Sequence, residues 1–153
     1  MIPYILFTVT DAVFLFAASF YDVRKRIIPN KIVLLMLVTC CVYADYLVLS
    51  GSFGENILYP LIKAVSGALL SLFILSVPEM MTKKSFGAGD KKVFMVLGLS
   101  LGPWGVVILM GITMVSAAVY NTIVKKKRSE AFAMAPHILM SYVVLVLYNS
   151  FHI

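Results

Sequence analysis

Long apolar runs separated by short polar segments make up almost the whole chain, at residues 2–21, 32–49, 57–77, 93–101, 106–124 and 131–150. A helix of about 20 apolar residues crosses a hydrocarbon core about 30 Å thick. The fourth run is too short to cross alone at about 1.5 Å per residue. The pattern therefore predicts an all-α polytopic membrane bundle of six transmembrane helices, the fourth short or partly inserted, in a single domain over residues 1–153.

Charge decides whether residues 93–124 form one helix or two. Lysines at 91–92 precede this stretch, and the basic cluster at 125–128 follows it. A single span would place the two clusters on opposite sides of the membrane, whereas a turn at the Gly and Pro residues of 102–105 places them together. Twelve of the 13 Lys and Arg residues then share one side, all except Lys63, and the positive-inside bias makes that side cytoplasmic. The sequence predicts a multi-pass protein of the plasma (inner) membrane with both termini outside.

Composition narrows the function classes. The chain is 61% hydrophobic and 13% charged, whereas soluble domains carry about 25% charged residues, so no separate soluble domain is expected. The net charge of +6 comes from short basic clusters between apolar runs, as in membrane loops, and no nucleic-acid partner is expected. Cys40 and Cys41 are adjacent and lack the spacing and further ligands of a metal site. We therefore expect no metal and no cofactor.

Two aspartates stand at the ends of apolar runs. Asp22 follows the first run and Asp90 precedes the fourth, so the topology places both carboxyls at the same face of the membrane. Ionisable groups at membrane depth are costly and usually functional. Neighbouring carboxyls share a proton, so that one can accept a proton from water while the other donates to a peptide carbonyl. Gly87 and Gly89 lack Cβ atoms and let a substrate chain approach closely. The pair predicts an aspartic-protease site that needs no metal.

Ordinary structural roles remain open for the same residues. Asp90 before a helix is also a favoured N-cap, and Pro29-Asn30 before the second apolar run is an ordinary turn and cap. Asp22 can also pair with Arg24 or Arg26. If the two aspartates act together, helix dipoles predict that Asp90, at a helix N-terminus, is the ionised member.

The order of these motifs resembles that of the prepilin peptidases, the membrane aspartic proteases with a Gly-x-Gly-Asp motif. The resemblance rests on Asp22 with six residues to Pro29-Asn30, on Gly87-Ala88-Gly89-Asp90-Lys91-Lys92, and on Ala135-Pro136 early in the last run. It covers essentially the whole chain, in order and in topology.

The resemblance implies cleavage of the short basic leader from type IV pilin-like precursors, on the cytoplasmic side and just before the hydrophobic helix of the precursor. The implied partners are a prepilin-like membrane protein and the lipid bilayer. The site residues are Asp22 and Asp90 as the catalytic pair, with Gly87, Gly89, Pro29 and Asn30 as substrate-binding or supporting residues.

The chain departs from the larger bacterial members of that family in its first cytoplasmic loop. Those members carry a Cys-x-x-Cys zinc loop and also N-methylate the product, whereas this loop is short and has no Cys. We therefore expect a peptidase without N-methyltransferase activity, similar to the peptidases of Flp-type (tight-adherence) pili or of archaeal preflagellins. The alternative is a non-catalytic or ion-conducting membrane subunit of a pilus or secretion system.

Other polar and small residues have less specific interpretations. Asp11 in the first run and Lys63 in the third can form a buried pair, or Lys63 can extend outward alone. Glu79 lies at the cytoplasmic rim, and His137 lies early in the last run, near enough to reach the aspartates. The Gly98-x-x-x-Gly102 spacing predicts a close-packing face within the bundle.

Overall fold

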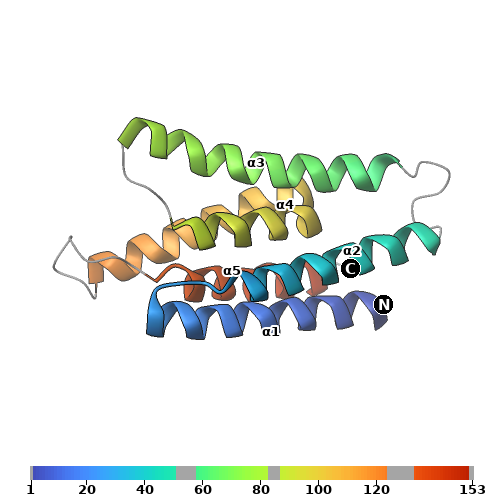
Figure 1. Cartoon of the computed structure of the whole chain (residues 1–153), viewed down its shortest axis with the longest axis horizontal. Helices are drawn as coiled ribbons and strands as arrows, with labels where there is room; N and C mark the ends of the chain where they lie inside the picture. The colour runs from blue at the N-terminus through green and yellow to red at the C-terminus, as the bar shows by residue number, and fades with distance from the viewer. Residues whose placement is uncertain (1, 51–57, 83–86, 124–132, 152–153) are drawn as a thin grey trace.

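The computed structural model describes residues 2–50, 58–82, 87–123 and 133–151. These residues form five α-helices and no strand, as Figure 1 shows. The helices are α1 (Ile2–Lys25), α2 (Asn30–Leu49), α3 (Leu58–Thr82), α4 (Ala88–Ile123) and α5 (Ala135–Phe151). The all-α prediction is confirmed for the described residues. The predicted count of six helices is not, because the fourth and fifth predicted segments both lie in α4.

A non-helical residue divides α4 into two parts. Gly102 has φ 73° and ψ −175°, in a region that favours glycine, and Pro103 has no N–H to continue the helical hydrogen bonds. Both ends of α4 lie at the same end of the bundle (Figure 1), so the chain reverses at this bend. The turn predicted at residues 102–105 is therefore present, and it returns Ile123 to the end where Ala88 starts.

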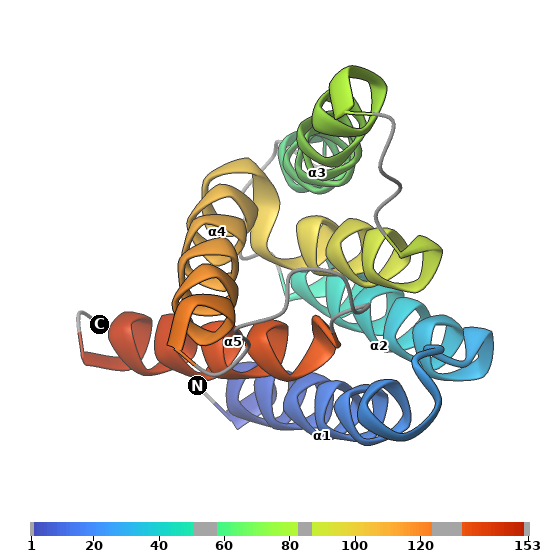
Figure 2. The same ribbon diagram turned by 90° about the vertical axis from the view of Figure 1, so that its left-hand side faces the viewer.

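The helices are arranged around α4. α1 and α3 end, and α2, α4 and α5 begin, at one end of the bundle, which we call the Asp22 end (Figure 1). Figure 2 looks along the bundle from that end and shows α4 between α3 and the other three helices. α3 packs almost entirely on α4, while α1 packs on α2 and α5. The predicted basic clusters at 24–26 and 91–92 lie at the Asp22 end, and those at 83–84 and 125–128 lie outside the described residues.

Glycines hold α3 tightly against α4. A Cβ atom added to Gly67 would lie 2.1 Å from the carbonyl oxygen of Gly98 and 2.8 Å from Cα of Gly102. These distances leave no room for a side chain, so the two backbones touch through small residues, as membrane helices commonly do. The predicted close-packing role of Gly98 and Gly102 within the bundle is confirmed.

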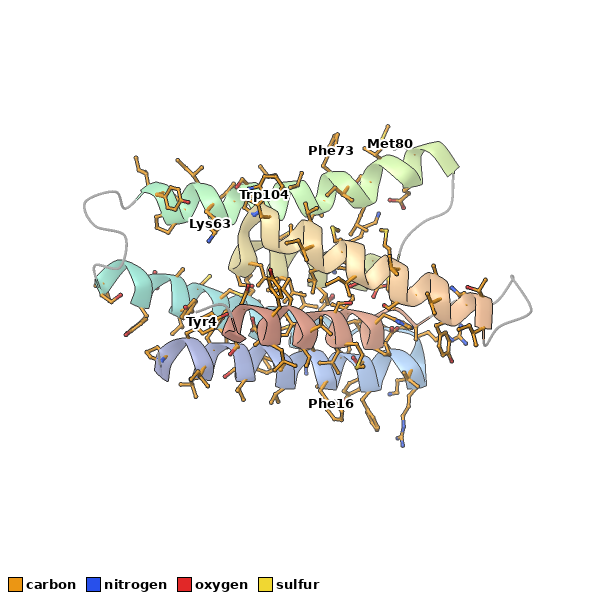
Figure 3. All side chains as sticks on the ribbon, turned by 180° about the vertical axis from the view of Figure 1, so that it is seen from behind. Tyr4, Phe16, Lys63, Phe73, Met80 and Trp104 are labelled. Atoms are coloured by element: carbon orange, nitrogen blue, oxygen red, sulfur yellow. The ribbon has the colours of Figure 1, made fainter. Side chains whose placement is uncertain are left out.

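Apolar side chains fill the core and also cover the outside of the bundle. Phe16 on α1 and Phe73 on α3 point outward on opposite sides (Figure 3), with 66% and 67% of their surface exposed. Within the described residues, three segments are long and apolar enough to cross a membrane: Pro3–Lys25, Leu58–Val77 and Ala88–Ile123. Because a water-soluble surface rarely exposes so much apolar area, this exterior indicates a multi-pass membrane protein.

Candidate active site

Asp22 near the end of α1 and Asp90 in the first turn of α4 line one cavity, which has a volume of about 370 Å³. Their side chains are close enough for their charges to interact. The rest of the lining is formed by Arg26, Ile27, Ile28, Pro29, Asn30, Gly87, Ala88, Gly89 and Lys92. The structure therefore brings all six predicted site residues together at the Asp22 end, from three separate parts of the fold.

The carboxyl of Asp22 is buried and anchored by the last helix. Its exposed fraction is 6%, and Oδ2 accepts a hydrogen bond of 3.0 Å from the backbone N–H of Ala135, the first residue of α5. The N-terminus of a helix carries partial positive charge, which stabilises a carboxylate placed there. Arg24 instead lies over the ring of Phe20, 4.5 Å from its centroid. Within the described residues, no ion pair joins Asp22 to Arg24 or Arg26.

The carboxyl of Asp90 has a different environment. Its Oδ1 is buried and has no hydrogen-bond partner within the described residues. A Cβ atom added to Gly87 would lie 2.7 Å from Asp90 Oδ2, and one added to Gly89 would lie 3.0 Å from Cβ of Ile28. The missing Cβ atom of Gly87 therefore leaves space for the Asp90 carboxyl, and that of Gly89 leaves space for Ile28 in the wall of the cavity.

These environments reverse the predicted distribution of charge between the two aspartates. A carboxylate is stabilised by hydrogen-bond donors and destabilised by burial without them. Asp22 has the Ala135 N–H and the α5 dipole, whereas one oxygen of Asp90 is buried without a donor. The geometry favours Asp22 as the ionised member and Asp90 as the protonated one. The dipoles of α1 and α4 alone favour the opposite assignment, because they leave out the dipole of α5.

The rim of the cavity is fixed by polar contacts between helices. Lys92 Nζ donates a hydrogen bond of 2.8 Å to Asn30 Oδ1, which ties the start of α4 to the start of α2. Asn30 is also the first residue of α2, and the backbone N–H of Ile32 donates to the carbonyl of Pro29. The Pro29-Asn30 segment thus starts a helix, as its ordinary interpretation predicts, and also lines the cavity.

Several other polar residues lie elsewhere. Asp11 is fully buried, its Oδ1 is 3.4 Å from the hydroxyl of Thr39, and within the described residues it forms no ion pair with the exposed Lys63. Glu79 pairs with Lys91 and does not line the cavity. Nδ1 of His137 lies 3.2 Å from the hydroxyl of Ser116, and His137 lines a different cavity. Among the described residues, no group of three or more His, Cys, Asp and Glu is placed to hold a metal ion.

Sequence reasoning missed two contributions to the site. The Ala135 amide belongs to the backbone, so residue type gives no sign that it would reach Asp22. Arg26 was considered only as an ion-pair partner, yet it lines the cavity and ends α1 with a left-handed φ of 53°. Ala135-Pro136, at the start of the last apolar run, was the one available signal for the α5 contact.

Comparison with protein families matches residues 10–122 to the type IV leader peptidase family. The chain belongs to this family. The match includes both aspartates and the glycines before Asp90, and α5 lies beyond it. Comparisons with curated proteins and with solved structures gave no match. Membership in the leader peptidase family confirms the predicted resemblance and implies leader peptidase activity in general.

Proposed function

We propose that this leader peptidase is an aspartic endopeptidase that removes the leader from type IV pilin-like precursors, with Asp22 and Asp90 as its catalytic pair. The supporting observation is that two carboxyls from different helices line one cavity in unlike environments, one with a backbone donor and one with an unpartnered oxygen. Aspartic proteases need this combination, because one carboxyl must accept a proton while the other donates one.

The two carboxyls divide the proton transfers of peptide hydrolysis. Asp22, a carboxylate held by the Ala135 amide, accepts a proton from water as the water oxygen bonds to the scissile carbonyl carbon. Asp90 donates its proton to the carbonyl oxygen, which gives a tetrahedral diol. The C–N bond then breaks, the leaving nitrogen takes the proton from Asp22, and a diol hydroxyl returns a proton to Asp90. One water is consumed, and the pair regains its starting state.

The remaining lining residues position the substrate chain. Gly87 and Gly89 let a peptide backbone approach Asp90 closely, because neither glycine has a Cβ atom. Pro29 and Asn30 line the same cavity, where Lys92 holds the Asn30 side chain. These four residues, Gly87, Gly89, Pro29 and Asn30, support or bind the substrate in this proposal.

The proposed location is the plasma (inner) membrane, with the Asp22 end at the cytoplasmic boundary and both termini outside. The basic residues at 24–26, Lys31 and 91–92 lie near that end, which the positive-inside bias places in the cytoplasm. A precursor with its hydrophobic helix in the same bilayer would present its leader at this boundary. N-methyltransferase activity is not part of the proposal, because the first loop lacks the Cys-x-x-Cys motif of the methylating members.

Leader removal in cells tests the proposed function. We expect co-expression of the chain with a small Flp-type prepilin to shorten the prepilin by its leader, and the mass of the product to show an unmethylated N-terminus. A variant that combines Asp22→Asn with Asp90→Asn should leave the precursor intact at equal expression. Cleavage at the wild-type rate by that double variant, or an uncleaved precursor beside the wild type for every leader-bearing prepilin supplied, would contradict the proposal.

Gly87→Ala is expected to impair cleavage without unfolding the protein. The new Cβ atom would lie 2.7 Å from Asp90 Oδ2, and the carboxyl must move because it is the freer of the two groups. A displacement of about 1 Å from the reacting geometry costs about 10²-fold in rate. The cleavage rate should fall by about this factor, while the thermal midpoint in detergent stays close to that of the wild type. Gly111→Ala, at a site with nothing within 4 Å, is the matched control and should cleave normally.

A further inference from the structure

A second cavity lies beside the first. It has a volume of about 420 Å³ and is lined mainly by residues near the end of α1, the end of α4 and the start of α5, with Arg26 common to both cavities. Its wall also includes Ala133 and Pro136, which flank the N-terminus of α5 on either side of Ala135. The Ala135 amide, between these two residues in the chain, binds the Asp22 carboxyl that lines the first cavity.

We propose that this second cavity is the docking site for the first part of the precursor's hydrophobic helix, on the carboxyl side of the scissile bond. The inference rests on the proposed function and adds where the substrate lies. A peptide cut at Asp22 must extend in both directions from the carboxyl. The two cavities share Arg26 as a lining residue, so in this proposal they take the chain on either side of the bond.

The chemistry of the two cavities sets the direction of the chain. Val23 and Met140 line the second cavity and are 61% and 66% exposed, so the cavity opens on an apolar outer surface that membrane lipid would otherwise cover. The first cavity has the two carboxyls, Asn30 and Lys92. Arg26, Tyr120 and His137 also line the second cavity, so it is the exposed edge at Val23 and Met140 that fits an apolar helix arriving from the bilayer. The leader then lies in the first cavity, beside the two carboxyls.

Arg26 lies where the substrate chain would cross between the cavities. It forms no ion pair with any described residue, and the left-handed turn at φ 53° fixes its backbone at the end of α1. The guanidinium has five N–H donors and no acceptor. In this proposal it donates to backbone carbonyl oxygens of the extended segment that precedes the precursor helix, because those carbonyls have no intrahelical donor.

Photocrosslinking tests the location of the precursor helix. A photoreactive side chain is placed at position 140 or at position 73 of the Asp90→Asn enzyme, which keeps the Asp22–Ala135 hydrogen bond and holds uncleaved precursor. Met140 and Phe73 have matched exposures of 66% and 67%, but Phe73 lies on the outer side of α3 (Figure 3). We expect at least about tenfold more precursor adduct from position 140 than from position 73. Equal yields at the two positions, or lipid as the only adduct at position 140, would overturn the proposal.

A kinetic measurement adds a second and independent readout. Val23→Trp should fill the cavity and raise KM for a membrane-anchored precursor about tenfold, while the matched Phe73→Trp variant leaves KM unchanged. Unaltered KM in a folded Val23→Trp enzyme would refute the docking site. The crosslink does not depend on cleavage, so a wild type that crosslinks but never cleaves would refute the catalytic proposal and leave docking supported. Normal cleavage by the wild type, together with no precursor adduct from position 140, would refute the docking site and leave the catalytic proposal supported.

Discussion

The Asp22→Asn and Asp90→Asn variants are each expected to cleave the precursor about 10²–10⁴-fold more slowly than the wild type, the range for loss of a general acid or base. Asp22→Asn removes the group that accepts the proton of water, and Asp90→Asn removes the group that protonates the carbonyl oxygen. Because the two act in one step, the double variant should be no slower than the slower single variant. Initial rates on a detergent-solubilised precursor, followed by gel mobility, provide the measurement.

Asp11→Asn is the control for this pair. Asp11 is also a buried carboxyl of α1, but it contacts Thr39 and lines neither of the two cavities at the Asp22 end. The Asp11→Asn variant should cleave at a rate within about threefold of the wild type. A tenfold change in rate corresponds to about 1.4 kcal/mol, which is more than a remote isosteric change should contribute. Normal cleavage by either dyad variant would exclude a catalytic pair. A strong loss of cleavage in Asp11→Asn alone would instead place the essential carboxyl at Asp11.

Gly98→Ala is expected to destabilise the contact between α3 and α4 strongly. Its Cβ atom would lie 2.6 Å from the carbonyl oxygen of Gly67, so rigid backbone rather than a flexible side chain must yield. Forcing extra volume into a packed core costs about 1–3 kcal/mol and sometimes more. α3 packs almost entirely on α4, so no other contact compensates when these helices move apart. The free energy of unfolding in mixed micelles should fall by at least this amount.

The matched control for Gly98→Ala lies on the same helix. Gly111 has nothing within 4 Å of its added Cβ atom, and replacing an unconstrained helical glycine by alanine stabilises by about 0.5–1 kcal/mol. Gly111→Ala should therefore raise the unfolding free energy or leave it unchanged. If Gly98→Ala proved as stable as Gly111→Ala, the close backbone contact between α3 and α4 would be wrong.

The sequence predicted the features that depend on periodicity and charge. Apolar run length identified the helices, and the lysines on both sides of residues 93–124 required the reversal that occurs at Gly102. The same topology placed Asp22 and Asp90 at one end, where they line one cavity. These features follow from the order of apolar and basic residues along the chain and from the rule that a helix crosses the membrane once. The catalytic role of the two residues stays a prediction.

Features that depend on packing between distant helices were not predictable. The hydrogen bond from the Ala135 amide to Asp22 makes Asp22 the carboxyl that the geometry favours as ionised. This bond could be predicted only if the position of α5 relative to α1 were known. The Asp11–Lys63 pair fails because α3 packs on α4, away from α1. The six-helix count is not confirmed for a local reason, since the two arms that the sequence separates meet at a single non-helical residue, Gly102, and so form one element, α4.

The hydrogen bond between Asp22 and Ala135 also sets the order in which the site is completed during synthesis. The two residues are 113 positions apart in the chain, and ribosomes add about 5–20 residues per second. Asp22 therefore enters the membrane boundary on the order of ten seconds before its partner exists. Through that interval the carboxylate has no backbone donor from α5. A nascent chain cannot hold the proposed dyad in working geometry until α5 docks, so the proposed proteolytic activity begins only after α5 has been made.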